Sequence, residues 1–198
     1  MPVSGHDIGF THKGLNRIRV AALSPEDQEQ RKALDIEFDY WDSLLALPIK
    51  SSKATAVESE AQSEFERSPG SPWGGREVPV GDSKHASVVI ELEGDVTYVG
   101  DEAQAKDKIA KDFNEAWSEN NACYEVVEDV KSEIHSDDPE VKTSSVVSNL
   151  APNQNGGYHV TILFTAEVTG FESAEAAKSR RDEEKAEYHE DFRRDEGL

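Results

Sequence analysis

The chain contains few of the residues that cross-link small proteins or bind metals tightly. Its 198 residues include a single cysteine, Cys123, so no disulfide can form within one chain. One cysteine also excludes a cysteine-based zinc cage, and no two histidines have the spacing that puts both on one helix face. No apolar run approaches the roughly 20 residues of a membrane-spanning helix. The sequence therefore predicts no metal site and no membrane partner.

Basic residues are also scarce. Lysine and arginine together number 21 against 41 aspartates and glutamates, which gives a formal net charge of -20. A chain of this composition lacks the broad basic face that binds nucleic acid, so we expect no direct nucleic-acid binding. Self-repulsion at this charge density opposes a compact state unless ions screen it, and the Debye length falls to about 3 Å at 1 M salt. We therefore expect either a salt-rich host or neighbouring molecules that supply counter-charge.

The first twenty residues are an exception to the acidic composition. They contain Lys13, Arg17 and Arg19 against Asp7 alone, a net charge of +2. Such a basic arm predicts docking on an acidic neighbour, for which the next copy of the same protein is a candidate. The alternative is that three cations in twenty residues have no function.

The composition divides the chain into four expected segments. An arm and an amphipathic helix occupy residues 1–49, a linker or extended strap 50–85, an α+β core 86–171 and a charged helix 172–198. The first helix is predicted to begin after Ser24, which suits an N-cap, with Pro25 at the first helical position, and to end before Pro48. Serine, alanine, glutamate, proline and glycine dominate the segment 50–85, which is typical of a linker.

The first helix is expected to carry an apolar stripe. The spacing of four, three and four residues places its members on one helix face, and they are Leu34, Phe38, Trp41 and Leu45. We expect this stripe to be buried in its own domain. A neighbouring subunit is the alternative partner.

The core segment predicts a small α+β layer. A strand over residues 86–92 is followed by a turn or bulge at Glu93-Gly94-Asp95, and a helix capped by Asp101 ends at Asn120-Asn121. The run 123–135 suits either a helix or a bent strand, and we favour the strand. Strands are also expected over 141–150 and 158–169, the latter with strict alternation. The predicted fold is an antiparallel sheet covered by one helix, in the order strand-helix-strand-strand-strand.

The order of elements over residues 86–171 resembles that of the dodecins, small flavin-storing shells. The resemblance rests on a strand from Ser87 to Glu93, a helix, and long strands ending in Tyr158-His159-Val160-Thr161-Ile162-Leu163-Phe164. The aromatic flavin clamp that this family implies has Tyr124 as its nearest candidate, and the insert from Asp137 to Asn155 is longer than the pattern. The resemblance is therefore one of topology, which does not carry function.

No motif in the chain indicates catalysis or a bound cofactor. The sequence has no Gly-x-Ser-x-Gly elbow and no phosphate-binding loop, and the lone Cys123 is typical of a small core residue. The trio His135, Asp137 and Asp138 falls in an expected turn, where a solvated loop is favoured over a weak divalent-cation site. We expect no catalytic, cofactor or metal residues.

The layout predicts a non-enzymatic structural subunit that assembles with copies of itself and with other subunits. A small core with an arm, a strap and two helices suits a repeated, symmetric assembly. The specific hypothesis is a virion component of a tailed virus of a halophilic host, a head–tail junction ring or a shell protein. The expected partner contacts are Arg17, Arg19, Leu34, Phe38, Trp41, Trp73, Tyr188 and Phe192. The alternative is a small cytoplasmic ligand-binding module or enzyme of a halophile, with a pocket formed by the sheet face around Tyr158, Val160 and Ile162 and flavin as a candidate ligand.

Overall fold

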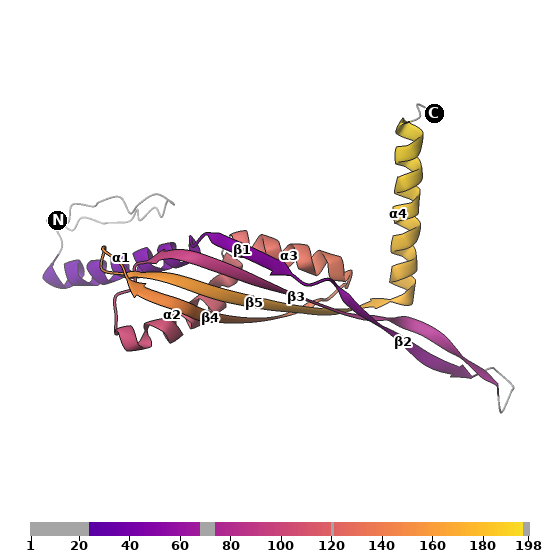
Figure 1. Ribbon diagram of the computed structural model, residues 1–198, viewed down its shortest axis with the longest axis horizontal. Helices are drawn as coiled ribbons and strands as arrows, with labels where there is room; N and C mark the ends of the chain where they lie inside the picture. The colour runs from indigo at the N-terminus through magenta and orange to yellow at the C-terminus, as the bar shows by residue number, and fades with distance from the viewer. Residues whose placement is uncertain (1–23, 68–73, 120, 196–198) are drawn as a thin grey trace, which may run out of the picture.

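The computed structural model describes residues 24–67, 74–119 and 121–195, with the side chains of residues 121 and 191–195 left out of the description. Four helices and five strands make up this part of the chain (Figure 1). The helices are α1 (Pro25–Leu45), α2 (Glu102–Ala116), α3 (Asn121–Ile134) and α4 (Ala174–Asp195), with a short 3-10 turn over Trp117–Glu119. The strands are β1 (Ile49–Ala54), β2 (Glu58–Arg67), β3 (Gly75–Val96), β4 (Glu140–Pro152) and β5 (Tyr158–Ser173).

The five strands form one open antiparallel sheet built around β3. The order is β1-β3-β5-β4, and β2 pairs with β3 on the same side as β1 but further along the strand. The longest pairing joins β3 to β5, from Gly81 opposite Ser173 to Val96 opposite Tyr158. β3 has 22 residues, so it reaches past the end of β5 and pairs there with β2 alone. The result is an elongated molecule in which a two-stranded ribbon projects from one end (Figure 1).

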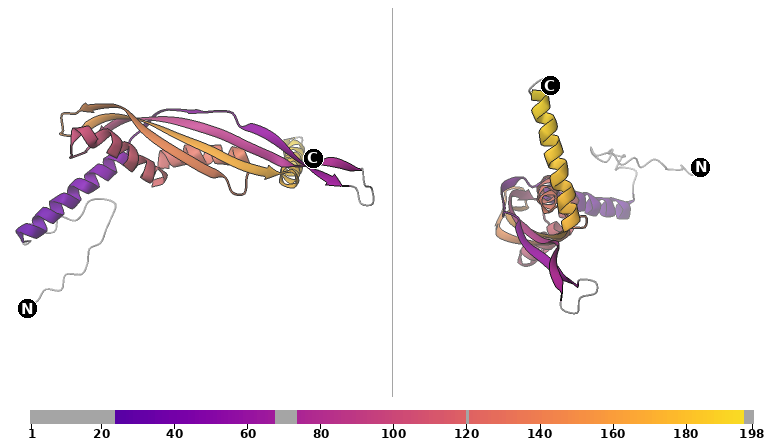
Figure 2. Two further views of the ribbon diagram at one scale, coloured as in Figure 1. Left: turned by 90° about the horizontal axis from the view of Figure 1, so that it is seen from below. Right: turned by 90° about the vertical axis from the view of Figure 1, so that its right-hand side faces the viewer.

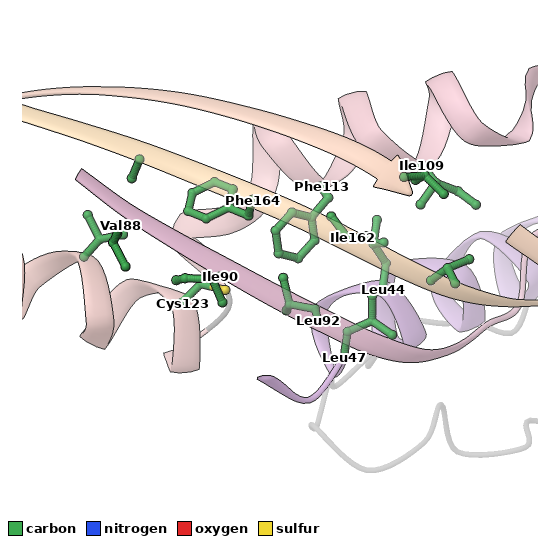
Figure 3. Close-up of a cluster of buried hydrophobic side chains, with 14 of the residues drawn as sticks. Leu44, Leu47, Val88, Ile90, Leu92, Ile109, Phe113, Cys123, Ile162 and Phe164 are labelled. Carbon is green, nitrogen blue, oxygen red and sulfur yellow. The ribbon is translucent and has the colours of Figure 1, made fainter. Parts of the chain in front are cut away.

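The hydrophobic core lies between one face of the sheet and the helices α2 and α3 (Figure 3). The strictly alternating residues of β5 fill the sheet side of this core, as the sequence predicts, and they are Val160, Ile162, Phe164, Ala166 and Val168, all without exposed surface. Phe164 meets Phe113 of α2 edge to face, with ring centroids 5.7 Å apart. This packing positions both helices on the same side of the sheet (Figure 2, left).

The predicted α+β class, with an antiparallel sheet, an N-terminal helix and a C-terminal helix, is confirmed. The prediction of a strand over 123–135 is wrong, because Asn121–Ile134 is helix α3. Cys123, Val127 and Ile134 lie on one face of α3 without exposed surface. α2 ends at Ala116, earlier than expected, and Asn121 begins the next helix instead of ending the first. Two helices therefore cover the sheet where one was expected, and the core segment has one strand fewer.

The turn expected at Glu93-Gly94-Asp95 is also absent from the described chain, since β3 continues through it. Glu93 pairs with Thr161 and Asp95 with His159 in unbroken register. Gly94 serves a close approach instead: a Cβ atom there would lie 2.9 Å from the Leu47 side chain. The glycine makes room for the connection between α1 and β1.

The segment 50–85 is extended, and its described residues belong to the same sheet as the core. β1 from residue 50 onward, β2 and the first half of β3 fall within it, and β3 crosses the expected boundary at residue 85. β2 has no buried residue, so its polar composition reflects the exposure of its side chains and not a lack of secondary structure. Backbone pairing with β3 satisfies its hydrogen bonds without a hydrophobic side-chain pattern.

Candidate assembly surfaces

The α1 stripe is only partly buried. The helix begins at Pro25 with Ser24 as its N-cap, as predicted, and the Ser24 side chain accepts a hydrogen bond from the Asp27 amide. The expectation that the whole stripe packs in its own domain is wrong, because Leu34 and Phe38 are 53% and 48% exposed. Trp41 is half-buried against the core. The outer part of the stripe is therefore available to another molecule.

A different side of α1 holds the helix to the body. Leu44 is completely buried, and the buried Tyr40 hydroxyl donates a 2.7 Å hydrogen bond to the Asp112 carboxylate of α2. Asp112 is itself buried and also accepts a 2.6 Å hydrogen bond from Lys108. Burial and the nearby carboxylate raise the pKa of Tyr40 well above its usual range. Tyr40 and Leu44 thus fix where α1 leaves the sheet.

A hairpin arm projects from the other end of the sheet (Figures 1 and 2). We define it as residues 63–67 of β2 and 75–79 of β3, the part that lies beyond Gly81 and pairs with no other strand. A Cβ atom on Gly81 would collide with the Glu172 carbonyl oxygen, so only glycine fits where the arm leaves the sheet. Pro79 is compatible with a strand here because it pairs with Ser63 next to the register shift between Gln62 and Ser63, and bulges and edges of sheets tolerate proline. Phe65 on the arm is 66% exposed.

Helix α4 stands away from the sheet (Figure 1). An ionic cluster at its base attaches it. The cluster consists of Lys84 of β3, Glu172 at the end of β5 and Arg180 of α4. Glu172 is 3% exposed and accepts a 2.6 Å hydrogen bond from Lys84 Nζ and a 2.9 Å hydrogen bond from Arg180 Nε. The Ser173 hydroxyl caps the helix by accepting from the Ala176 amide. The described side chains further along α4 are exposed, including Tyr188.

The ionic cluster perturbs its carboxylate strongly. The hydrogen bond from Arg180, together with Lys84, outweighs the effect of burial and lowers the pKa of Glu172 to about 2. The same contact, with a second carboxylate at Glu184, raises the pKa of Arg180 further above its usual range. Glu172 and Arg180 therefore both remain charged near neutral pH.

The face of the sheet opposite α2 and α3, the outer face, carries an apolar patch that the sequence analysis missed. We call Val89, Val146 and Leu163 the outer-face patch; they come from three adjacent strands and are 42%, 60% and 37% exposed. Val146 and Leu163 are directly paired across β4 and β5. The alternation of β5 could have revealed this patch, because Leu163 is the one large aliphatic residue among the mostly polar positions of β5 that face away from the core.

The predicted contact residues are spread over the molecule and do not form one site. Leu34, Phe38 and Trp41 lie on α1, and Tyr188 lies 69% exposed on α4 at the other end of the molecule. Arg17, Arg19 and Trp73 lie outside the described residues, as does the side chain of Phe192. The features that the sequence did not reveal are the outer-face patch, the hairpin arm and the buried ionic cluster.

The groups that could carry chemistry are occupied in structural contacts. Cys123 has no exposed surface, and burial raises the pKa of its thiol to about 12, which leaves it protonated and unreactive. His159 lies between two carboxylates on the outer face, with Nδ1 2.9 Å from Asp95 and Nε2 3.2 Å from Glu93. These hydrogen bonds, to Asp95 first, raise the pKa of His159. Within residues 24–67, 74–119 and 121–195, no group of three or more His, Cys, Asp or Glu side chains is arranged to hold a metal ion.

One open hollow on the described surface has a volume of about 560 Å³. Its lining has more acidic than basic residues and includes Glu58, Glu60, Asp138 and Glu140 together with Lys84, His85 and Phe171. The expected pocket on the sheet face around Tyr158, Val160 and Ile162 is contradicted, because Val160 and Ile162 have no exposed surface. The alternative hypothesis therefore loses the pocket on which it depended.

No protein-family model matches the chain, and no curated protein matches its sequence. Among the helices of the described residues, none is both long and apolar enough to cross a membrane.

Proposed function

We propose that the chain is a non-enzymatic structural subunit of a large homo-oligomeric assembly, a virion component of a tailed virus of a halophilic host. The specific role is a head–tail junction ring or a shell protein, which places the protein in the virion. Its partners are copies of itself and other subunits of the particle. One observation carries this proposal: α1, the hairpin arm and α4 all project from a small core with exposed apolar side chains.

Each projection has too few contacts within one chain to stabilise it along its length. α4 has 22 residues, and among its described side chains only Ala177 is buried. Helices in water gain most of their stability from packing an apolar face, and a two-stranded ribbon alone is marginally stable. Contacts with neighbouring copies would supply the missing burial for the helix and the arm.

The charge supports the halophilic host. A formal net charge of -20 repels neighbouring copies at low ionic strength and is screened at high salt. Several described ion pairs are exposed, such as Lys111 with Glu115, and contribute little stability. Assembly of this chain is therefore expected to need salt.

The test measures the size of the purified protein by light scattering coupled to gel filtration, at about 0.1 M and at molar KCl, where the Debye length is about 10 Å and about 3 Å. Negative-stain microscopy of the high-salt sample follows. A ring or shell of one defined size supports the proposal, and a monomer at every salt and protein concentration refutes it. Mass spectrometry of particles purified from culture supernatant separates a virion protein from a cytoplasmic one.

A further inference from the structure

Two exposed apolar surfaces of the described chain cannot contact each other within one molecule. The first is the outer part of the α1 stripe, Leu34 and Phe38, with Trp41 at its inner end. The second is the outer-face patch of the sheet. Tyr40 ties α1 to Asp112 of α2, and α2 covers the opposite face of the sheet (Figure 2, left). The α1 stripe therefore cannot reach the outer-face patch of its own chain.

The two surfaces have similar dimensions. From Leu34 to Trp41 the helix rises seven residues, about 10 Å at 1.5 Å per residue. The outer-face patch crosses the adjacent strands β3, β5 and β4, which are about 4.8 Å apart, so it also spans about 10 Å. A helix laid across these strands covers all three patch residues with one stripe.

Part of the edge of each surface carries charge of the opposite sign to the other. Asp35 and Asp42 lie three residues before and four residues after Phe38, on the same side of α1. On the outer face, Lys53 pairs in register with Val89. Lys142 lies four residues before Val146 on β4, 3.4 Å from Glu140 and opposite Glu167 of β5, so it is already close to carboxylates of its own chain. A lysine beside the patch is notable because lysine and arginine together are only about half as numerous as aspartate and glutamate in this chain. Glu91, beside the patch, already forms an ion pair with Lys50.

We propose that Leu34, Phe38 and Trp41 of one copy pack on the outer-face patch of the next copy, with Asp35 and Asp42 near the partner's lysines. This contact rests on the proposed function and gives it a geometry. Because the two surfaces differ, the interface is heterologous, and repetition produces a closed ring or an open filament. Each copy then covers its neighbour's sheet face and has its own sheet face covered in turn.

The test is a disulfide between two singly substituted chains. A chain with Phe38→Cys is mixed with a chain with Val146→Cys at molar KCl and oxidised, and native Cys123 does not compete because it is buried. The matched control replaces Phe38→Cys by Ile36→Cys, which is equally exposed but on another side of α1. We expect the Phe38–Val146 pair to form at least ten times more linked dimer than the control pair.

A second measurement does not depend on cysteine chemistry. The double variant Leu34→Glu with Phe38→Glu is expected to raise the protein concentration required for assembly at least tenfold. Ile36→Glu is expected to leave that concentration unchanged. Circular dichroism checks that each variant folds. If the wild type assembles but neither the cysteine pair nor the glutamate double variant differs from its control, the proposed contact is wrong and the proposed function is unaffected. A wild type that is monomeric under all conditions overturns both.

Discussion

The ionic cluster gives the sharpest stability prediction, because it buries a carboxylate between two cations at the junction of β3, β5 and α4. Lowering the pKa of Glu172 from 4.5 to about 2 corresponds to about 3 kcal/mol at 1.36 kcal/mol per pKa unit. Glu172→Gln removes the charge and leaves Lys84, only 9% exposed, without its counter-ion. Breaking a buried pair in this way costs about 3–5 kcal/mol. We therefore expect Glu172→Gln to lower the free energy of unfolding by about 3 kcal/mol.

The assay is urea unfolding followed by circular dichroism, because urea leaves the ionic strength unchanged. The matched control is Glu115→Gln, which breaks the exposed Lys111–Glu115 pair and is expected to cost under about 1 kcal/mol. Molar KCl screens the exposed pair but affects the buried one much less, so the difference between the variants persists at high salt. Hydrogen exchange in the first turns of α4 is expected to rise in Glu172→Gln alone.

The pH dependence has a definite sign. Glu172 is a group with a depressed pKa, so its stabilisation is present above about pH 4.5 and is lost as the pH falls toward 2. The difference between wild type and Glu172→Gln is expected to shrink over that window. The reasoning fails if Glu172→Gln costs no more than Glu115→Gln at neutral pH.

Three further predictions test the anchor of α1, the core and the outer face. Tyr40→Phe is expected to cost about 1–3 kcal/mol in urea unfolding, because it leaves the buried Asp112 without that donor; a loss below about 0.5 kcal/mol contradicts the anchoring role. Phe164→Ala, at a position without exposed surface, is expected to cost about 3–5 kcal/mol, and a near-neutral effect would contradict the packing with α2. His159 is expected to titrate above pH 6.5 by NMR, because its hydrogen bonds to Asp95 and Glu93 raise its pKa. The folding stability that these contacts contribute is complete below pH 6.5 and is lost as the pH rises through the raised pKa. Asp95→Asn is expected to lower the pKa of His159, and an unchanged titration refutes the assigned contact.

The candidate surfaces could be predicted from sequence only in part. The exposed stripe residues Leu34 and Phe38 were found because helical spacing is visible in the sequence, but their lack of an intrachain partner was not. The outer-face patch depends on which strands become neighbours, since Val89 and Leu163 are 74 positions apart in numbering and meet only through the pairing of β3 with β5. The ionic cluster joins Lys84 and Glu172, 88 residues apart.

The sequence by itself determined the features that depend on a few neighbouring residues. It specified the caps at Ser24 and Asp101, the turn around Asn153, where Gly156 takes a positive φ, and the buried face of β5. These features follow from local hydrogen bonds and from the period of two residues, which no distant contact reverses.

Only the tertiary structure decided between helix and strand for residues 123–134, and it decided which side of α1 is buried. The apolar spacing of α3 is compatible with either conformation, and packing against β3 and β5 favours the helix. The polar segment 50–67 contains strands because β3 offers its backbone hydrogen bonds along a free edge. Local patterns thus set the conformations that each segment can adopt, and burial and pairing over long sequence distances select among them.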